Sequence, residues 1–248
     1  MSNVAYGMHT VRVLLTRSPA RVRRVLIVSG RDAARHAEIR ELALRAGVQL
    51  SGADEATLDR MAAGGRHQGV VAEVVARATD PETQLEEALE AAGDAPLLLV
   101  LDGVQDPHNL GACLRSADAA GVAAVIVPRD RAAGMTPVVR KVAAGAAETV
   151  PFIAVVNLAR TLRELKDRGF WLVGTDDETG KSLYDADLKG PTAIVMGSEG
   201  EGMRRLTREC CDLLVSIPMA GAVESLNVSV AAGVVLFEAV RQRRPRRP

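Results

Sequence analysis

After residue 97, the hydrophobic residues gather in short runs separated by helix-like stretches in which polar residues recur. The runs are LLLVLDG, AAVIVP, PFIAVV, WLVGTDD, TAIVMGSE and DLLVSIPM. Continuous apolar runs of this length are typical of strands that are covered on both faces, as in a parallel sheet alternating with helices. The pattern therefore predicts an α/β domain with a mainly parallel sheet in this part of the chain.

The first part of the chain also alternates between strand and helix patterns. Residues 22–30 and 70–75 have the apolar, β-branched character of strands, and residues 32–48 have helical spacing with Asp32 as a candidate N-cap. These elements predict a second, smaller α/β domain that is separate from the sheet after residue 97.

An acidic segment separates the two patterns, with Pro81 and Pro96 on either side of a short helix-like stretch. We place the domain boundary there. The chain ends in the arginine- and proline-rich RQRRPRRP, of which we expect the last residues to be disordered. The predicted organisation is an N-terminal domain, an acidic linker, a C-terminal domain and a basic tail over residues 1–76, 77–96, 97–243 and 244–248.

The composition allows a substantial buried core, since 48% of the 248 residues are hydrophobic. No apolar run reaches the roughly 20 residues that span a bilayer, and the first residues, MSNVAYGMHT, lack the pattern of a signal peptide. We therefore expect a cytoplasmic protein without a membrane partner. The three cysteines, Cys113, Cys210 and Cys211, form no CxxC pair, so we expect structural thiols and no metal site.

The formal net charge is zero, but arginines cluster near both ends of the chain. Either cluster could be ordinary solvated surface, or Arg21, Arg23 and Arg24 could contact the phosphates of a nucleic acid. Aromatic residues make up only 2% of the chain, which disfavours recognition by base stacking. If RNA binds, phosphate contacts and shape should dominate.

Unusual polar residues follow three of the predicted strands. In the first loop, Asn109 is a candidate helix N-cap and Arg115 follows in the same helix, and either could be purely structural. The second loop, MGSEGEGM at 196–203, has glycines that let a ligand approach the backbone. Its carboxylates would repel a phosphate, so a neutral or cationic ligand fits better, although a plain glycine turn is the alternative. The third loop, 217–229, precedes the last helix.

Together these loops resemble the three motifs of the SpoU/TrmH branch of the SPOUT methyltransferases. The matching patterns are N-x-G-x-x-x-R at 109–115, MGSEGEGM, and IPM-x-G-x-x-x-SLNVS at 217–229. The N-terminal part, with YGMHTV and GRHQGVVAEV, resembles the L30e-like substrate-binding domain of bacterial 23S rRNA guanosine 2'-O-methyltransferases. The resemblance implies a deep trefoil knot in the C-terminal domain, a homodimer with active sites at the subunit interface, and S-adenosylmethionine as methyl donor.

By position, the resemblance also assigns the site. The implied catalytic residues are Asn109, Arg115, Glu199 and Asn227. The implied cofactor-binding residues are Met196, Gly197, Gly202, Ile217, Met219, Ser225 and Leu226, with Ala220 nearby. The implied reaction is methyl transfer to the ribose 2'-OH of a guanosine in the peptidyl-transferase loop of 23S rRNA.

Family mechanisms often make the arginine the general base. Deprotonating a free guanidinium near neutral pH would cost about 8 kcal/mol. We therefore expect Arg115 to hold the target phosphate and stabilise the developing alkoxide, with Glu199 as a second candidate for receiving the proton. The role of Ser229 stays open, and we expect His67 and His108 to be structural.

Three other functions compete with this one. A 2'-O-methyltransferase for tRNA or another rRNA site would share the motifs, but tRNA enzymes generally lack the N-terminal domain. A non-catalytic RNA-binding dimer would not need the four polar motif residues together. A nucleotide-dependent oxidoreductase would need a G-x-G-x-x-G sequence after the first strand of the α/β domain, where this chain has none.

Overall fold

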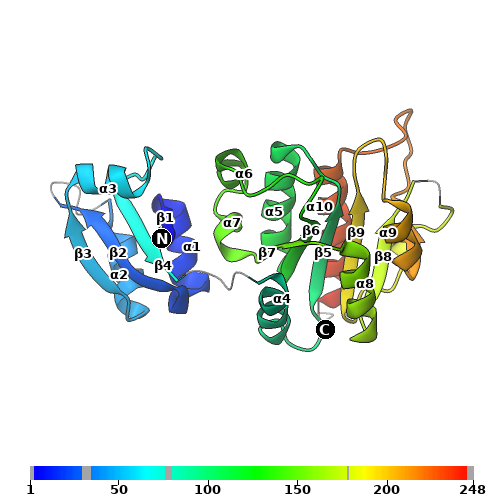
Figure 1. The fold of residues 1–248 in the computed structure, drawn as a ribbon, viewed down its shortest axis with the longest axis horizontal. Coiled ribbons are helices and arrows are strands. Elements are labelled where there is room, and N and C mark those ends of the chain that lie inside the picture. Colours follow the sequence, from blue (N-terminus) through cyan, green and yellow to red (C-terminus); the bar gives the residue numbers. More distant parts are fainter. Residues whose placement is uncertain (1–2, 30–34, 76–79, 178, 245–248) are drawn as a thin grey trace. The chain divides into compact units, whose positions relative to one another are not determined.

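The computed structural model describes residues 3–29, 35–75, 80–177 and 179–244 (Figure 1). The chain divides into two compact units, Met1–Thr79 and Asp80–Pro248. Asp32, proposed above as an N-cap, and residues 245–248 of the expected disordered tail lie outside the described residues.

The N-terminal unit is a four-stranded mixed sheet in the order β1-β4-β2-β3, in which β2 and β3 are parallel and the other pairs are antiparallel. Apolar residues of α1, α2, β2 and β4 form its main core. The predicted strands near residues 22–30 and 70–75 are confirmed, whereas the helix predicted over 32–48 covers a shorter span. The elements are β1 (Asn3–Tyr6), α1 (Met8–Arg17), a 3₁₀ turn (Pro19–Arg21), β2 (Val22–Val28), α2 (Ala37–Arg45), β3 (Gln49–Ala53), α3 (Glu55–Met61) and β4 (Val70–Val74).

The C-terminal unit contains a six-stranded sheet in the order β10-β8-β9-β5-β6-β7, and every neighbouring pair is parallel. The predicted mainly parallel α/β fold is therefore confirmed, while the knotted path of the chain stays a prediction. The strands are β5 (Leu97–Asp102), β6 (Ala124–Pro128), β7 (Phe152–Val155), β8 (Trp171–Thr175), β9 (Thr192–Gly197) and β10 (Leu213–Val215).

Helices cover both faces of this sheet (Figure 1). One face packs against α5, α6, α7 and α10, and the other packs against α4, α8 and α9. This explains why the strands are apolar throughout, since alternate residues of β5 enter the two different cores. The helices are α4 (Pro81–Glu90), α5 (Pro107–Ala120), α6 (Pro137–Val142), α7 (Ala146–Thr149), α8 (Leu158–Asp167), α9 (Arg205–Cys210) and α10 (Val228–Arg243), with a 3₁₀ turn at Leu183–Asp185.

The segment expected to be an acidic linker contains α4, which is part of the C-terminal unit. Asp80 caps the helix by accepting a hydrogen bond from the Thr83 backbone N–H, and Pro81 is its first residue. Leu85 and Ala88 enter the core on the side of α8. The predicted short helix is therefore present, and its acidic residues Glu82, Glu86, Glu87 and Glu90 lie on the exposed face of an amphipathic helix.

Close packing of α6 on α5 depends on Gly111. A Cβ atom at Gly111 would lie 2.7 Å from Val142 Cβ and 3.0 Å from the Val139 carbonyl oxygen. Gly233 in α10 differs, because a Cβ there would lie 3.8 Å from Ser116 Oγ, which is an ordinary contact.

We predict that Gly111→Ala lowers the free energy of unfolding by about 1–3 kcal/mol, because a methyl group forces α6 away from α5. Gly233→Ala is the matched control and should be neutral or stabilising by up to about 1 kcal/mol, since alanine favours a helix. Denaturant unfolding followed by the fluorescence of Trp171, the single tryptophan, measures both. Equal stabilities of the two variants would contradict the close approach at Gly111.

Candidate active site

The strand order brings the three motif loops to one edge of the parallel sheet. The β5 strand lies beside β9, with Asp102 opposite Gly197, so the loops that follow these two strands start side by side. The loop after β10 runs over the same edge to the start of α10, orange at the top of the unit in Figure 1. In open α/β sheets, ligands bind beyond the carboxyl ends of the strands, at the point where the strand order reverses direction.

Glu199 connects the three loops through one carboxylate oxygen. Asn109 Nδ2 donates to Glu199 Oε1 at 3.1 Å, and Asn227 Nδ2 donates to the same oxygen at 2.7 Å. The backbone N–H of Val228 donates to it as well, at 3.3 Å. Glu199 Oε2 has no hydrogen-bond partner among the described residues.

Asn227 joins this cluster and also begins the last helix. Its Oδ1 accepts hydrogen bonds from the Ser229 backbone N–H at 3.0 Å and from Ser229 Oγ at 2.6 Å. Its Nδ2 also donates to Asn109 Oδ1 at 3.0 Å. Asn227 is therefore the N-cap of α10, and Ser229 fixes its orientation.

Asn109 lies inside the first helix of this region and is not its N-cap, so that prediction was wrong. The N-cap of α5 is Asp106, which accepts a hydrogen bond from the His108 backbone N–H at 2.9 Å, and Pro107 begins the helix. Asn109 is only 9% exposed and its side chain points to Glu199 and Asn227. The D-P sequence at 106–107 is the local signal for this helix start.

The glycine loop after β9 is a tight turn closed by two backbone hydrogen bonds. Ser198 N–H donates to the Gly202 carbonyl at 3.0 Å, and Gly202 N–H donates back to the Ser198 carbonyl at 3.1 Å. Gly200 and Gly202 have φ values of 83° and 66°, which favour glycine. A Cβ atom at Gly197 would lie 2.1 Å from the Gly202 carbonyl carbon, so only glycine fits there.

An ion pair between the buried Asp102 and the half-exposed Arg204, which we did not predict, supports this edge. Asp102 is 1% exposed, and its Oδ1 accepts a hydrogen bond from Arg204 Nε at 2.6 Å while its Oδ2 accepts one from the Arg204 backbone N–H at 3.0 Å. Arg204 is the residue before α9. The pair ties the end of β5 to the end of the glycine loop, and nothing in the local sequence indicated that these residues meet.

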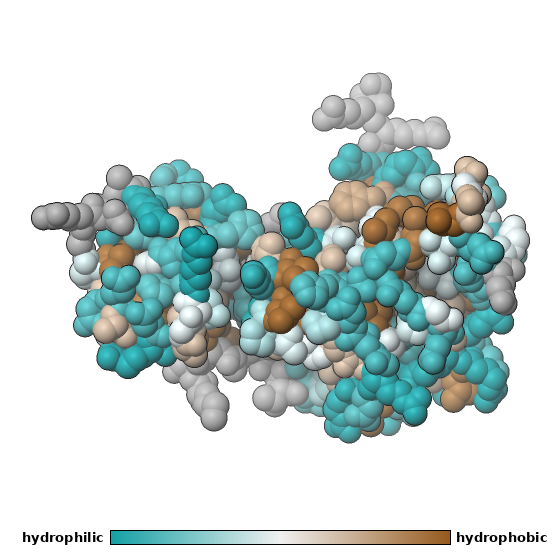
Figure 2. All heavy atoms as spheres, turned by 90° about the horizontal axis from the view of Figure 1, so that it is seen from above, coloured by the Kyte–Doolittle hydropathy of each residue, from teal (hydrophilic) through white to brown (hydrophobic). Residues whose placement is uncertain are grey.

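A cavity of about 520 Å³ lies beside the cluster, between the ends of β8, β9 and β10 and the loop that leads to α10. This volume is within the usual range for small-molecule sites. All seven residues expected to bind a cofactor line it: Met196, Gly197, Gly202, Ile217, Met219, Ser225 and Leu226. Seen from above, the C-terminal unit presents hydrophobic patches within a mainly hydrophilic surface (Figure 2).

The cavity is more acidic than the motifs suggested, because the end of β8 contributes residues that sequence reasoning missed. Thr175, Asp176 and Asp177 lie at this end, and Arg208 Nε donates to Asp176 Oδ2 at 2.6 Å. The only sequence signal for them was the apolar run that ends in TDD. The carboxylates that line the cavity are those of Asp176, Asp177, Glu199, Glu201 and Glu224.

Arg115 is the one expected catalytic residue that does not join the cluster. It is exposed on α5, six residues beyond Asn109, and its side chain has no hydrogen-bond or ion-pair partner among the described residues. Six residues turn a helix by about 240°, so Arg115 and Asn109 lie on different sides of α5.

His67 and the thiol of Cys113 have structural positions. His67 Nδ1 accepts a hydrogen bond from the Gly69 backbone N–H at 3.0 Å, and its Nε2 lies 3.0 Å from Asp59 Oδ1. The side chain of His108 is exposed. Burial, with a further contribution from Glu199, raises the pKa of the Cys113 thiol to about 12. This thiol therefore stays protonated and is a poor nucleophile at neutral pH.

Arg24, one of the three arginines considered for phosphate contact, forms an ion pair with Glu73 on the neighbouring strand. Its guanidinium donates to both carboxylate oxygens of Glu73 on β4, at 2.7 Å and 2.8 Å. These hydrogen bonds, together with the positive charge, hold the pKa of the Glu73 carboxyl below its ordinary value. Arg23 is exposed and stays a candidate for phosphate contact.

Neither a membrane span nor a metal cluster is found in the parts of the chain that the structure describes. No described helix is long and apolar enough to cross a bilayer. No group of three or more described His, Cys, Asp or Glu side chains is placed to hold a metal ion.

Comparisons with known proteins assign a family to each unit. Residues 4–79 match the family described as RNA 2'-O ribose methyltransferase substrate binding, and residues 96–237 match the SpoU rRNA Methylase family. The 23S rRNA (guanosine-2'-O-)-methyltransferase RlmB of Pseudomonas aeruginosa is 57% identical and aligns over 97% of this chain and 96% of its own length. The protein of the same name from Yersinia pestis is 56% identical, with 98% of both chains aligned.

Solved structures also resemble the chain. The SpoU methyltransferase AviRb from Streptomyces viridochromogenes, crystallised with the cofactor AdoMet, superposes with a TM-score of 0.71 and 28% identity, over 97% of this chain and 90% of that one. A TrmH/SpoU tRNA modifying enzyme from A. aeolicus has a TM-score of 0.56 and 32% identity, but covers only 66% of this chain and 84% of its own.

We predict that Asn227→Asp makes stability depend on pH at this edge. The substituted side chain keeps the oxygen that caps α10, but it loses both N–H donors and places a second carboxylate against Glu199. Repulsion raises the pKa of this carboxyl pair in the folded protein above its unfolded value. The folded state therefore keeps a proton on this pair at pH values where the unfolded chain has lost it, and the unfolding free energy relative to wild type should fall as pH rises above about 4, the ordinary pKa of a carboxyl group.

Denaturant unfolding at several pH values measures this effect. The control is Asn227→Ala, which removes the cap and the donors without adding charge, and should cost about 1 kcal/mol at every pH. If the two variants have the same pH dependence, Asn227 does not contact Glu199.

Proposed function

This chain belongs to the SpoU rRNA methylase family, and from that premise we propose that it transfers a methyl group from S-adenosylmethionine to the ribose 2'-oxygen of a guanosine in 23S rRNA. The observation that carries the proposal is the Asn109–Glu199–Asn227 cluster at the side of an acidic cavity. The target in the peptidyl-transferase loop and a cytoplasmic location follow as parts of the same proposal.

The volume and the charge of the cavity suit this methyl donor. Its volume of about 520 Å³ suits a nucleoside with an amino-acid tail, and the glycine turn lets the ligand approach the backbone. The carboxylates around it favour a ligand with cationic groups. When bound, S-adenosylmethionine supplies an electrophilic methyl group on a positively charged sulfur.

The residues of the cavity divide into two roles. The apolar side chains of Met196, Ile217 and Leu226 and the backbone of Gly197 would hold the adenosyl portion. Gly202, Met219 and Ser225 complete the lining around it. Because the main chain of a tight turn and of a strand end forms much of this wall, it can hold the donor in one orientation beside the cluster.

Glu199 is the group best placed to receive the proton of the 2'-hydroxyl. Three N–H groups occupy its Oε1 and fix the carboxylate, while Oε2 has no partner among the described residues. These hydrogen bonds orient the Glu199 carboxylate before the substrate binds, and a general base has to be positioned within reach of the proton that it takes. Asn109 and Asn227 hold it in place, and Arg115 would grip the phosphate and stabilise the developing alkoxide.

We propose that the Arg115 side chain beside each Glu199 cluster comes from the second subunit of a homodimer. In one chain it is exposed and lies on a different side of α5 from Asn109, as described above. On α10, Val230 and Phe237 lie two turns apart on one side of the helix and are 52% and 47% exposed. Exposed apolar groups on a helix that packs against α5 suit a subunit contact next to Arg115.

The two units would have different functions in the reaction. We assign RNA substrate binding to residues 1–76 and methyl transfer to residues 97–243, with the family matches as support. The presence of the N-terminal unit also favours 23S rRNA over tRNA as the substrate. The tRNA modifying enzyme from A. aeolicus aligns with only 66% of this chain, whereas the 23S rRNA relatives align along nearly all of it.

We predict that the protein transfers label from S-adenosylmethionine to one guanosine ribose of 23S rRNA taken from cells that lack the enzyme. Glu199→Gln should slow the transfer by about 10²–10⁴-fold, because the amide can still accept hydrogen bonds at the Oε1 position but cannot take up the proton. Mapping the methylated nucleotide and measuring single-turnover rates as a function of pH give both results.

The matched measurement is the affinity of the Glu199→Gln variant for S-adenosylmethionine, which should stay near that of wild type. An unaltered rate and pH profile in this variant would exclude Glu199 as the base. Labelling of tRNA in place of 23S rRNA would overturn the proposed substrate.

A mixing experiment tests whether Arg115 acts across the subunit interface. We predict that Arg115→Ala and Glu199→Gln are each inactive alone, and that an equal mixture regains about a quarter of wild-type activity after subunit exchange. Half of the dimers would then be mixed, and each of these would contain one site with both residues intact.

The control is a mixture of Glu199→Gln with Asn227→Ala, which should regain nothing, because both residues belong to the same chain's cluster. Failure of the first mixture to recover activity, with exchange verified, would place Arg115 in its own chain's site or outside the mechanism.

A further inference from the structure

The segment between β6 and the end of α6 lies against the loop after β5 and against α5, the helix that carries Asn109. The Ala133 backbone N–H donates to the Val104 carbonyl at 2.9 Å, which joins this segment to the loop after β5. Further along, α6 packs on the first turns of α5 at Gly111, two residues from Asn109. In Figure 1, α6 stands beside α5 at the top of the unit. Residues 129–141 are therefore part of the same sheet edge as the cluster.

Three basic side chains of this segment are exposed, and within the described part of the chain they have no partner. The side chains of Arg129, Arg131 and Lys141 make no hydrogen bond or ion pair with any described residue. Their neighbour Arg140 pairs with Glu148, and Asp130 is the acidic side chain exposed between the two arginines. Many arginines elsewhere in the unit are neutralised, as Arg204 is by Asp102 and Arg208 by Asp176.

The backbone at Arg131 supports a role beyond solvation. Its φ of 63° lies in the left-handed region, which is unfavourable for a side chain of this type. Such conformations cost of order 1–3 kcal/mol, persist only where the surroundings impose them, and cluster at functional sites. Here the bond from Ala133 to Val104 fixes the chain two residues further on.

The sheet edge thus has two electrostatic halves with the cluster between them. On one side, Asp176, Asp177, Glu201 and Glu224 line the cavity. On the other side lie Arg129, Arg131 and Lys141. A phosphodiester chain is repelled by the first half and attracted by the second. An RNA strand whose ribose reaches Glu199 is therefore expected to approach over β6 and α6.

We propose that Arg129, Arg131 and Lys141 bind the phosphates of the RNA strand that flank the target nucleotide. The inference rests on the proposed function and adds a phosphate-binding surface on the catalytic unit. Arginine side chains suit this task because their planar groups can donate two parallel hydrogen bonds to one phosphate. These are positioning residues, since they fix the strand without contacting the reacting atoms.

The test compares the triple variant Arg129→Gln, Arg131→Gln, Lys141→Gln with wild type in binding a 23S rRNA fragment at several salt concentrations. Each lost phosphate contact lowers the slope of log affinity against log salt by about 0.7 for a single strand, so the triple variant should lose about 2 from the slope. The affinity for S-adenosylmethionine, measured by titration calorimetry, should be unchanged and shows that the variant is folded.

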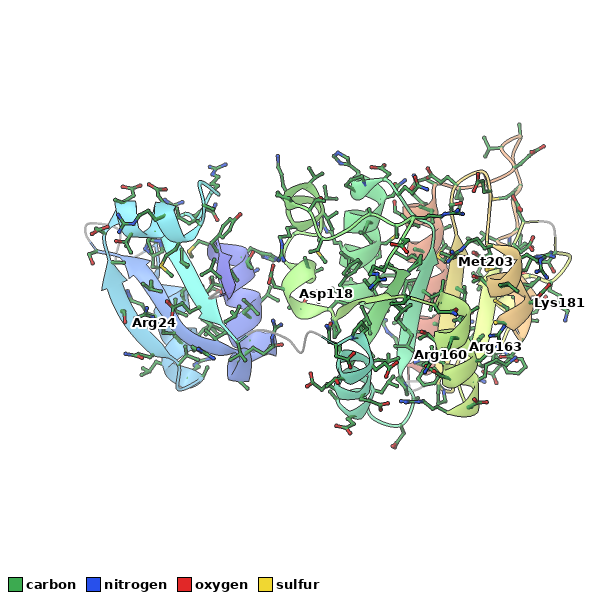
Figure 3. All side chains as sticks on the ribbon, in the orientation of Figure 1. Arg24, Asp118, Arg160, Arg163, Lys181 and Met203 are labelled. Atoms are coloured by element: carbon green, nitrogen blue, oxygen red, sulfur yellow. The ribbon has the colours of Figure 1, made fainter. Side chains whose placement is uncertain are left out.

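Arg163→Gln is the matched control. Arg163 is exposed on α8, which covers the opposite face of the sheet, and its side chain also has no partner among the described residues (Figure 3). Its replacement should leave the salt slope as in wild type. A triple variant with an unchanged slope, or a control with an equal decrease, overturns the phosphate surface.

Methyl transfer by the wild type to the same fragment is measured in parallel, so that the two failures are distinguishable. If wild type methylates the fragment and the triple variant keeps its slope, the phosphate surface is wrong and the proposed function stands. If wild type transfers no methyl group to rRNA, the proposed function fails, and the inference that rests on it fails too, whatever the slopes.

Discussion

One carboxylate oxygen, Glu199 Oε1, holds the site together. It accepts hydrogen bonds from Asn109 on α5, from Asn227 at the start of α10 and from the Val228 backbone, so that three segments far apart in sequence meet at one atom. Hydrogen bonds to a charged acceptor are stronger than neutral ones, and each donor left without this acceptor would have to find another. The position of the glycine turn and the start of the last helix therefore depend on each other.

The parallel sheet makes this meeting possible. Carboxyl ends of parallel strands share one edge, and β5 lies between β9 and β6. The loop that leads from β5 to α5 and Asn109 therefore has the glycine turn on one side and the basic segment on the other. Asp102 and Arg204 connect the first two loops through an ion pair whose carboxylate is buried. Only one partner of this pair is fully buried, and removing Arg204 would leave that charge without compensation.

The electrostatics of this edge match the two substrates in the proposed reaction. A methyl donor with cationic groups and a polyanionic RNA have opposite requirements, and the edge meets them by separating its charges along the strand order. This separation is invisible in the formal net charge of zero, because that sum says nothing about where each sign lies. The acidic side is part of the cavity, and the basic side is exposed.

The sequence alone determined the fold class, the main strands and the residues of the three motifs. Apolar runs report local burial on both faces, and glycine and asparagine at fixed spacing report local backbone requirements, so both can be read from neighbouring residues. Local reasoning still erred at Asn109, where the D-P start at Asp106 has the stronger capping geometry. It expected a short helix between Pro81 and Pro96, but it did not show that Leu85 and Ala88 of this helix enter the core, because the residues that they contact lie far along the chain.

The tertiary structure alone decided which residues meet. Strand order placed Asp176 and Asp177 in the cavity, paired Asp102 with Arg204, and left Arg115 outside the cluster of its own chain. Such contacts depend on how distant strands are arranged, and hydrophobic periodicity contains no information about that arrangement. Helix geometry adds the final constraint, since each residue along α5 turns the side chain by about 100°, and a shift of two residues decides whether a side chain faces Glu199 or solvent.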